Sequence, residues 1–167
     1  MKNTILSVTI LLFFAVSGYA QSCTRHIETA GRFSYCPPAG WESKPSPNGG
    51  PYKKFISPEG VAPVANINVK DEVTLVSHND YLATAMQALL KENALKPGAS
   101  VKIVEWTSFT TDSKIRGSRM VYEMLQDGIQ IFVIQFILDL RGKKLIFTGG
   151  TTQESRSDVE PLITAAA

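Results

Sequence analysis

Hydrophobic residues occupy both alternating sets of positions between Ile129 and Asp139. A β-strand that is apolar on both faces needs cover on both faces of its sheet, so we predict a central, doubly covered strand here. Gln135 is its polar exception, and we expect it to form a hydrogen bond beneath a helix rather than to line a small pocket. One face should carry Ile129, Ile131, Val133 and Ile137, and the other Phe132, Ile134, Phe136 and Leu138.

Shorter segments of alternating polarity predict further strands on both sides of this one. The turns between the later strands are short, and Asp127-Gly128 is typical of a tight hairpin that joins antiparallel neighbours. Another turn is expected at residues 141–143. The predicted strands cover residues 31–35, 52–56, 65–70, 101–106, 120–125 and 145–148.

An amphipathic segment predicts a long helix between these strands. Ser77 and Asp80 resemble a capping box at its start, and Pro97-Gly98 follows its end. Its apolar residues share one face, which we interpret as a core-facing stripe. The alternative interpretation is a greasy binding groove around Tyr81 and Met86. The face carries Tyr81, Leu82, Ala85, Met86, Leu89 and Leu90.

A second helix is predicted over residues 155–167, with Val159, Leu162 and Ile163 on one side. Pro161 is compatible with this helix if it begins near Asp158, because the first turn leaves backbone N–H groups unpaired. The order is thus strands, helix, four antiparallel strands and helix. Together with the doubly covered strand, this order predicts an α+β fold, an α/β/α sandwich around a central antiparallel sheet.

The segment from Gly31 to Trp41 reads Gly-Arg-Phe-Ser-Tyr-Cys-Pro-Pro-Ala-Gly-Trp. It places a strand end, a tight turn and an indole in succession. With the later order of helix, hairpins and closing helix, it resembles PsbP-like domains, a superfamily that includes bacterial periplasmic DcrB-like proteins. The resemblance spans most of residues 21–167. It implies the fold and a broad accessory role, and it transfers no site residue.

The first residues have the pattern of a secretory signal peptide. Lys2 supplies positive charge, an apolar run covers residues 5–16, and Gly18 and Ala20 are the small residues that a signal peptidase reads. We therefore expect residues 1–20 to be removed. Residues 21–167 should form a single PsbP-like domain in the periplasm or outside the cell.

Cys23 and Cys36 are the two cysteines of the chain. In an exported protein they favour a disulfide, and closing the short loop between them would stabilise the fold by about 3 kcal/mol. A redox pair is disfavoured because the C-x-x-C spacing is absent. Lipidation of Cys23 is the other alternative, although residues 20–22 lack the large aliphatic residue that such signals usually carry.

The 167 residues carry a formal net charge of +2, and 44% are hydrophobic while 19% are charged. This ordinary composition gives no electrostatic reason to expect nucleic acid as a partner. Beyond the first residues no apolar segment reaches the ~20 residues that cross a bilayer. We therefore expect no transmembrane segment in the mature chain.

His26 and His78 are the only histidines, which limits most catalytic proposals. A hydrolase would use His78 with Asp80, but no G-x-S-x-G motif accompanies them, and a solvated helix cap is the simpler interpretation. His26 and Glu28 would share one face of a strand, and two ligands make a weak metal site.

Other charged residues also lack a catalytic pattern. Asp71 and Glu72 would point to opposite faces of their strand, so they form no acid–base pair. The basic residues at 53–54 and 141–144 are interpreted as solvated turns or protection of a sheet edge. The sequence therefore predicts no catalytic site, metal or cofactor.

The combined pattern favours an exported, non-enzymatic binding or accessory module. Its partner would be another envelope or secreted protein, or a small ligand. Two alternatives stay open: a hydrolase that uses His78 and Asp80, and an envelope lipoprotein tethered through Cys23.

Overall fold

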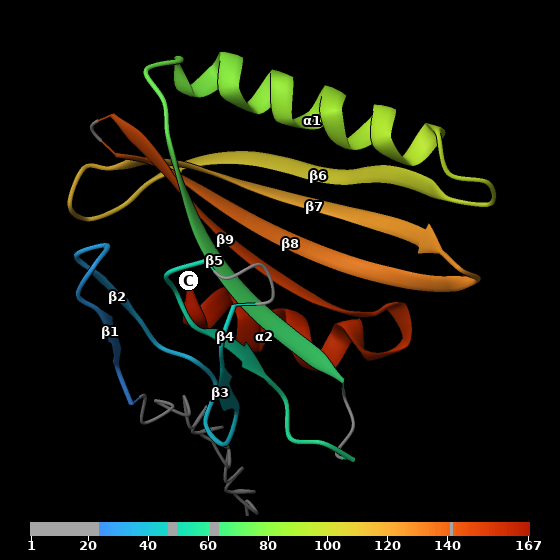
Figure 1. Cartoon of the computed structure of the whole chain (residues 1–167), viewed down its shortest axis with the longest axis horizontal. Helices are drawn as coiled ribbons and strands as arrows, with labels where there is room; N and C mark the ends of the chain where they lie inside the picture. Colours follow the sequence, from blue (N-terminus) through green and yellow to red (C-terminus); the bar gives the residue numbers. More distant parts are fainter. Residues whose placement is uncertain (1–23, 47–49, 61–63, 141) are drawn as a thin grey trace, which may run out of the picture.

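The computed structural model describes residues 24–46, 50–60, 64–140 and 142–167. Within these ranges, seven strands form an antiparallel sheet in the order β3-β4-β5-β9-β8-β7-β6, and β1 pairs with β2 in a separate hairpin (Figure 1). The strands are β1 (His26–Glu28), β2 (Phe33–Tyr35), β3 (Glu42–Lys44), β4 (Lys54–Ile56), β5 (Ala65–Val73), β6 (Ser100–Thr110), β7 (Arg116–Gln126), β8 (Ile129–Leu140) and β9 (Lys143–Thr152).

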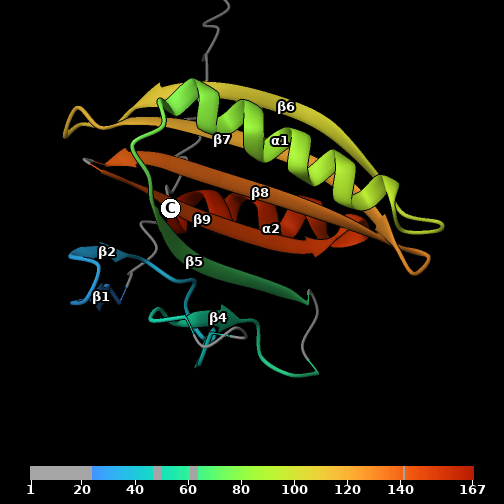
Figure 2. The same cartoon turned by 45° about the horizontal axis from the view of Figure 1, so that its top comes forward.

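Helices cover both faces of the large sheet. On one face, α1 (His78–Ala94) lies over β6 and β7. On the other, α2 (Arg156–Ala166), preceded by the 3₁₀ turn η1 (Gln153–Ser155), packs against β8 and β9 (Figures 1 and 2). The predicted α/β/α sandwich around an antiparallel sheet is confirmed.

Strand β8 lies between β7 and β9 and is covered on both faces, as its apolar pattern predicts. Phe132 and Ile134 are fully buried on the α2 side, whereas Val133 and Ile137 are buried on the α1 side. Ile129 departs from the prediction, because it stands beside the β7–β8 turn and is 56% exposed.

Local chemistry sets the element ends. Asp127 and Gly128 adopt positive φ angles of 52° and 77° in the β7–β8 turn, a conformation that these two residue types reach at low cost. The Ser77 side chain accepts a hydrogen bond from the Asp80 backbone N–H and so caps α1. The second helix, α2, begins at Arg156, within one residue of the prediction but before Asp158, the start that would have placed Pro161 in the first turn. Pro161 therefore lies inside the helix, and its missing N–H leaves one helical hydrogen bond unmade.

The β1–β2 hairpin packs against the core on the α2 side. The Tyr35 ring meets Phe55 and Phe147 edge to face, with centroids 5.7 and 5.6 Å apart. The Cys36 backbone N–H donates to the Ala166 carbonyl, 3.3 Å away, at the end of α2. These contacts connect the beginning of the described chain to its last helix.

The predicted signal peptide and Cys23 lie outside the described residues, so the cleavage site and the Cys23–Cys36 disulfide stay predictions. Among the helices that the structure describes, none combines the length and apolar character needed to span a bilayer.

Candidate functional site

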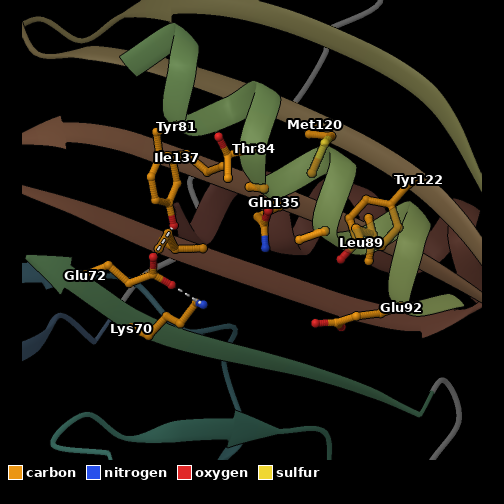
Figure 3. Close-up of a pocket in the computed structure, with 13 residues that line it drawn as sticks. Lys70, Glu72, Tyr81, Thr84, Leu89, Glu92, Met120, Tyr122, Gln135 and Ile137 are labelled. Carbon is orange, nitrogen blue, oxygen red and sulfur yellow. Dashed lines mark hydrogen bonds and ion pairs between the residues drawn. The ribbon is translucent and has the colours of Figure 1, made fainter. Parts of the chain in front are cut away.

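Short side chains on α1 leave a groove between this helix and the sheet. Thr84, Ala85 and Ala88 face β8 and β9, and residues of this size cannot fill the space between a helix and a sheet. The resulting cavity measures about 430 Å³, within the range of small-molecule sites (Figure 3). The strands contribute Lys70 and Glu72 from β5, Met120 and Tyr122 from β7, Gln135 and Ile137 from β8, and Ile146 from β9.

The apolar face of α1 is therefore only partly a core stripe. Leu82 is buried against Ile137 and Ile146, as predicted. Leu90, by contrast, is 44% exposed. Tyr81 lines the groove, whereas Met86 is absent from its lining.

One end of the groove holds a hydrogen-bonded charge cluster (Figure 3). The Tyr81 hydroxyl donates to Glu72 Oε2 at 2.6 Å, and Lys70 Nζ donates to Glu72 Oε1 at 2.6 Å. Burial alone would raise the pKa of Glu72, but these two hydrogen bonds outweigh it and hold the pKa below its ordinary value. Burial and the bond to Glu72 raise the pKa of Tyr81. At neutral pH this end therefore contains a carboxylate and a protonated phenol.

The opposite end is formed by Tyr122 and Glu92 (Figure 3). The Tyr122 side chain is 6% exposed, and burial raises the pKa of its phenol to about 12. Neither its hydroxyl nor the Glu92 carboxylate forms a hydrogen bond or ion pair with the part of the chain that the structure describes. These two groups are the polar groups that the protein leaves unused at this end.

The floor between the two ends carries Gln135. Its Nε2 donates to Thr148 Oγ1 on the neighbouring strand at 3.1 Å, and the same side chain lines the groove. Both interpretations of this polar position thus apply together. Asn68 stands next to Thr148 in the β5–β9 register, and its buried Oδ1 has no partner among the described residues.

The His78 and Asp80 side chains have different partners. His78 Nε2 lies 2.9 Å from Ser118 Oγ, its Nδ1 is buried without a partner in the described chain, and the Asp80 carboxylate accepts from Ser77. His78 is 3% exposed and Ser118 is 0% exposed, so the predicted solvated cap is wrong for His78. Burial holds the pKa of His78 below its ordinary value. A buried serine cannot attack a substrate, and the pair ties the start of α1 to β7.

His26 and Glu28 do share one side of β1, with His26 Nε2 and Glu28 Oε1 2.9 Å apart. Glu28 also accepts from the Lys53 backbone N–H, which gives this carboxylate a structural role. Within the described ranges, no cluster of three or more His, Cys, Asp or Glu side chains could hold a metal ion.

The remaining charged residues correct one prediction. Asp71 faces away from Glu72, as expected, and accepts hydrogen bonds from Tyr52 and Lys143. Lys144 is 3% exposed and pairs with Asp139, so it is not a solvated turn residue. The register between β8 and β9 places Lys144 opposite Asp139. The basic residues at 141–144 could not by themselves predict this pairing.

Comparisons with known proteins address the fold. No protein-family model and no curated protein matches the chain. Among solved structures, cyanobacterial PsbP (CyanoP) from Synechocystis sp. PCC 6803 superposes with a TM-score of 0.66 at 15% sequence identity, over 90% of this chain and 92% of that one. The fold is PsbP-like.

Two further structures share the PsbP-like fold. PA94 from Pseudomonas aeruginosa, described as a putative regulator of unknown function, has a TM-score of 0.56 at 20% identity and covers 83% of this chain and 89% of its own. LpqN from Mycobacterium tuberculosis, described as involved in cell envelope biogenesis, has a TM-score of 0.56 at 13% identity and covers 90% and 83%. Identities this low establish the fold alone, so the functional residues must come from this chain itself.

The sequence reasoning did not identify Lys70, Glu92 or Tyr122 as site residues. A signal was nevertheless present in Ala85, because it is a short residue on the face of α1 that was predicted to fill the core. Short residues on a helix that covers a wide sheet face indicate unfilled space.

Proposed function

We propose that the protein is an exported, non-enzymatic binding module of the periplasm or the extracellular space, and that the groove beneath α1 holds a small ligand. The observation that carries this proposal is the groove itself, about 430 Å³, with a largely apolar middle that includes Gln135 and with polar groups at both ends. Ligand sites are typically concave and mostly apolar, with a few polar groups that fix orientation.

The chemistry of the lining supports binding rather than catalysis. General acid–base catalysis needs a group whose pKa lies near the working pH. The pKa values of Tyr81 and Tyr122 are raised and that of Glu72 is lowered, so all three stay in one protonation state near neutrality. The lining residues include no histidine, cysteine or serine.

The location of the protein rests on the amino-terminal pattern and on the neighbours in fold. One of them, LpqN, is described as involved in cell envelope biogenesis, which is compatible with an envelope role here. Another envelope or secreted protein would then be its partner, and would bind the module with or without the small ligand in the groove.

A groove-filling variant tests the binding proposal. Ala85→Leu places a larger side chain in the groove, whereas Ala83→Leu adds the same atoms on the exposed side of α1. The probe is N-phenyl-1-naphthylamine, a neutral dye that fluoresces in apolar sites. We expect wild type and Ala83→Leu to bind the dye alike and Ala85→Leu to lose most of the signal. Equal signals from all three proteins would contradict the proposal.

Intact mass spectrometry of the exported protein tests the location and the cysteines together. We expect a mature chain that begins at Gln21, lighter by two hydrogen atoms because Cys23 and Cys36 are joined. An acylated Cys23 would contradict the soluble form and show that the protein is tethered to the envelope. Quantitative alkylation of both thiols without a reductant would exclude the disulfide.

A further inference from the structure

The charges that line the groove do not cancel. Lys70 is the one cationic side chain among the lining residues, and Glu72 already holds it at 2.6 Å. Glu92 has no such partner within the described ranges. Lys144, a buried cation, is paired with Asp139 and lies outside the lining. The uncompensated charge of the groove is therefore negative and lies at the Glu92 end.

The phenol at the same end also lacks a partner. Tyr122 as a whole is 6% exposed and lines the groove, and its hydroxyl forms no hydrogen bond with a described residue. The hydroxyl is not among the fully buried side-chain atoms without a partner, so it is open to a hydrogen bond from water or from a ligand in the groove. The ring of a tyrosine also attracts cations through its face. Glu92 and Tyr122 thus favour a positively charged group.

Between the two ends most of the lining is apolar, with Gln135 and Thr84 as the polar exceptions. Ala85, Ala88 and Leu89 contribute one wall, and Met120, Ile137 and Ile146 contribute the floor. The helix advances about 1.5 Å per residue, so the stretch from Tyr81 to Glu92 extends over roughly 16 Å. A space of this shape suits an elongated apolar group better than a compact polar one.

We propose that the ligand of this groove is a cationic amphiphile, with its ammonium group at the Glu92–Tyr122 end and its apolar chain along Leu89, Met120 and Ile146. The inference rests on the proposed function, because it names the class of ligand for the same site. It excludes an anionic amphiphile as the preferred ligand, since the groove offers no free cation to receive one.

Three detergents with the same ten-carbon chain test the charge preference below their micelle concentrations. They are decyltrimethylammonium, decyl sulfate and decyl maltoside, and isothermal titration of the mature protein at low salt gives the affinities. We expect decyltrimethylammonium to bind about tenfold more tightly than decyl sulfate, with a difference that shrinks at high salt.

Variants separate the charge preference from binding itself. Glu92→Gln should reduce the preference for the cation to within about threefold, a modest change because exposed ion pairs are weak. Glu154 is an exposed residue away from the groove, so Glu154→Gln should leave the preference unchanged. A preference that favours decyl sulfate, or one that survives Glu92→Gln, would overturn the inference and leave the groove as a binding site. If Ala85→Leu binds all three detergents like wild type, or wild type binds none, the proposed function fails as well.

Discussion

The sheet is packed to different degrees beneath α1 and around Gly149 under α2. Elsewhere the α2 side also leaves a cavity of about 390 Å³, lined by residues that include Phe109, Phe136 and Phe147. On the α2 face, a Cβ added at Gly149 would lie 2.3 Å from Ile163 Cγ2, because this side chain fills the space directly above the glycine. On the α1 face, a Cβ at the adjacent Gly150 would have its nearest neighbour 3.7 Å away. Val159 and Ile163 of α2 are fully buried, whereas Leu82 is the one buried apolar residue of α1.

This difference separates the best-packed part of the core from the groove that we propose as the ligand site. Close packing around Val159 and Ile163 beneath α2 supplies dispersion and burial of the kind that hold a domain together. The α1 face buries less apolar surface, and its groove contains the Tyr122 hydroxyl and the Glu92 carboxylate, which have no partner among the described residues. Strands β8 and β9 carry both, because their successive residues point to opposite faces.

The largest effect should come from truncation on the α2 face. Phe132 is fully buried, so Phe132→Ala should lower the free energy of unfolding by about 3–5 kcal/mol, measured by urea denaturation. Lys102→Ala, at an exposed position of β6, is the control and should change it little. Similar losses in Phe132→Ala and Lys102→Ala would refute the central position of β8.

The adjacent glycines give a matched pair of smaller effect. Gly149→Ala should destabilise the protein by about 1–3 kcal/mol, since Ile163 or the helix must shift to admit the methyl group. Gly150→Ala meets only ordinary contacts and should be neutral or slightly stabilising. Thermal melts of both variants measure the contrast. Equal melting temperatures would mean that the two faces are packed alike.

The smallest effect is expected at the Tyr81–Glu72 end of the groove. Tyr81→Phe removes a hydrogen bond to a partly exposed carboxylate and should cost about 1 kcal/mol at pH 7. The folded pKa of Glu72 is lowered, so the stability it contributes is present above its ordinary pKa of 4.5 and is lost as pH falls below it. Urea melts at pH 7 and pH 3 should therefore show the gap between wild type and variant closing at pH 3. If wild type and Tyr81→Phe differ in unfolding free energy as much at pH 3 as at pH 7, the destabilisation comes from lost packing and not from the hydrogen bond to Glu72.

Sequence patterns predicted the features that depend on neighbouring residues. The doubly apolar run of β8, the turn at Asp127-Gly128 and the cap at Ser77 are local, and the structure confirms all three. The pairing of His78 with Ser118 joins residues 40 positions apart, and only the placement of α1 against β7 brings them together. The groove has the same origin, because its size depends on how far α1 stands from β8 and β9.

The most direct test of the division between the faces is methyl NMR with decyltrimethylammonium added to the mature protein. Met120, Ile137 and Ile146 point into the groove, whereas Ile134 and Ile163 lie in the α2 core. We predict saturable chemical-shift changes at the first three methyl-bearing residues and almost none at the other two. Shifts at Ile134 and Ile163 as large as those at Ile137 and Ile146 would contradict a ligand site confined to the α1 face.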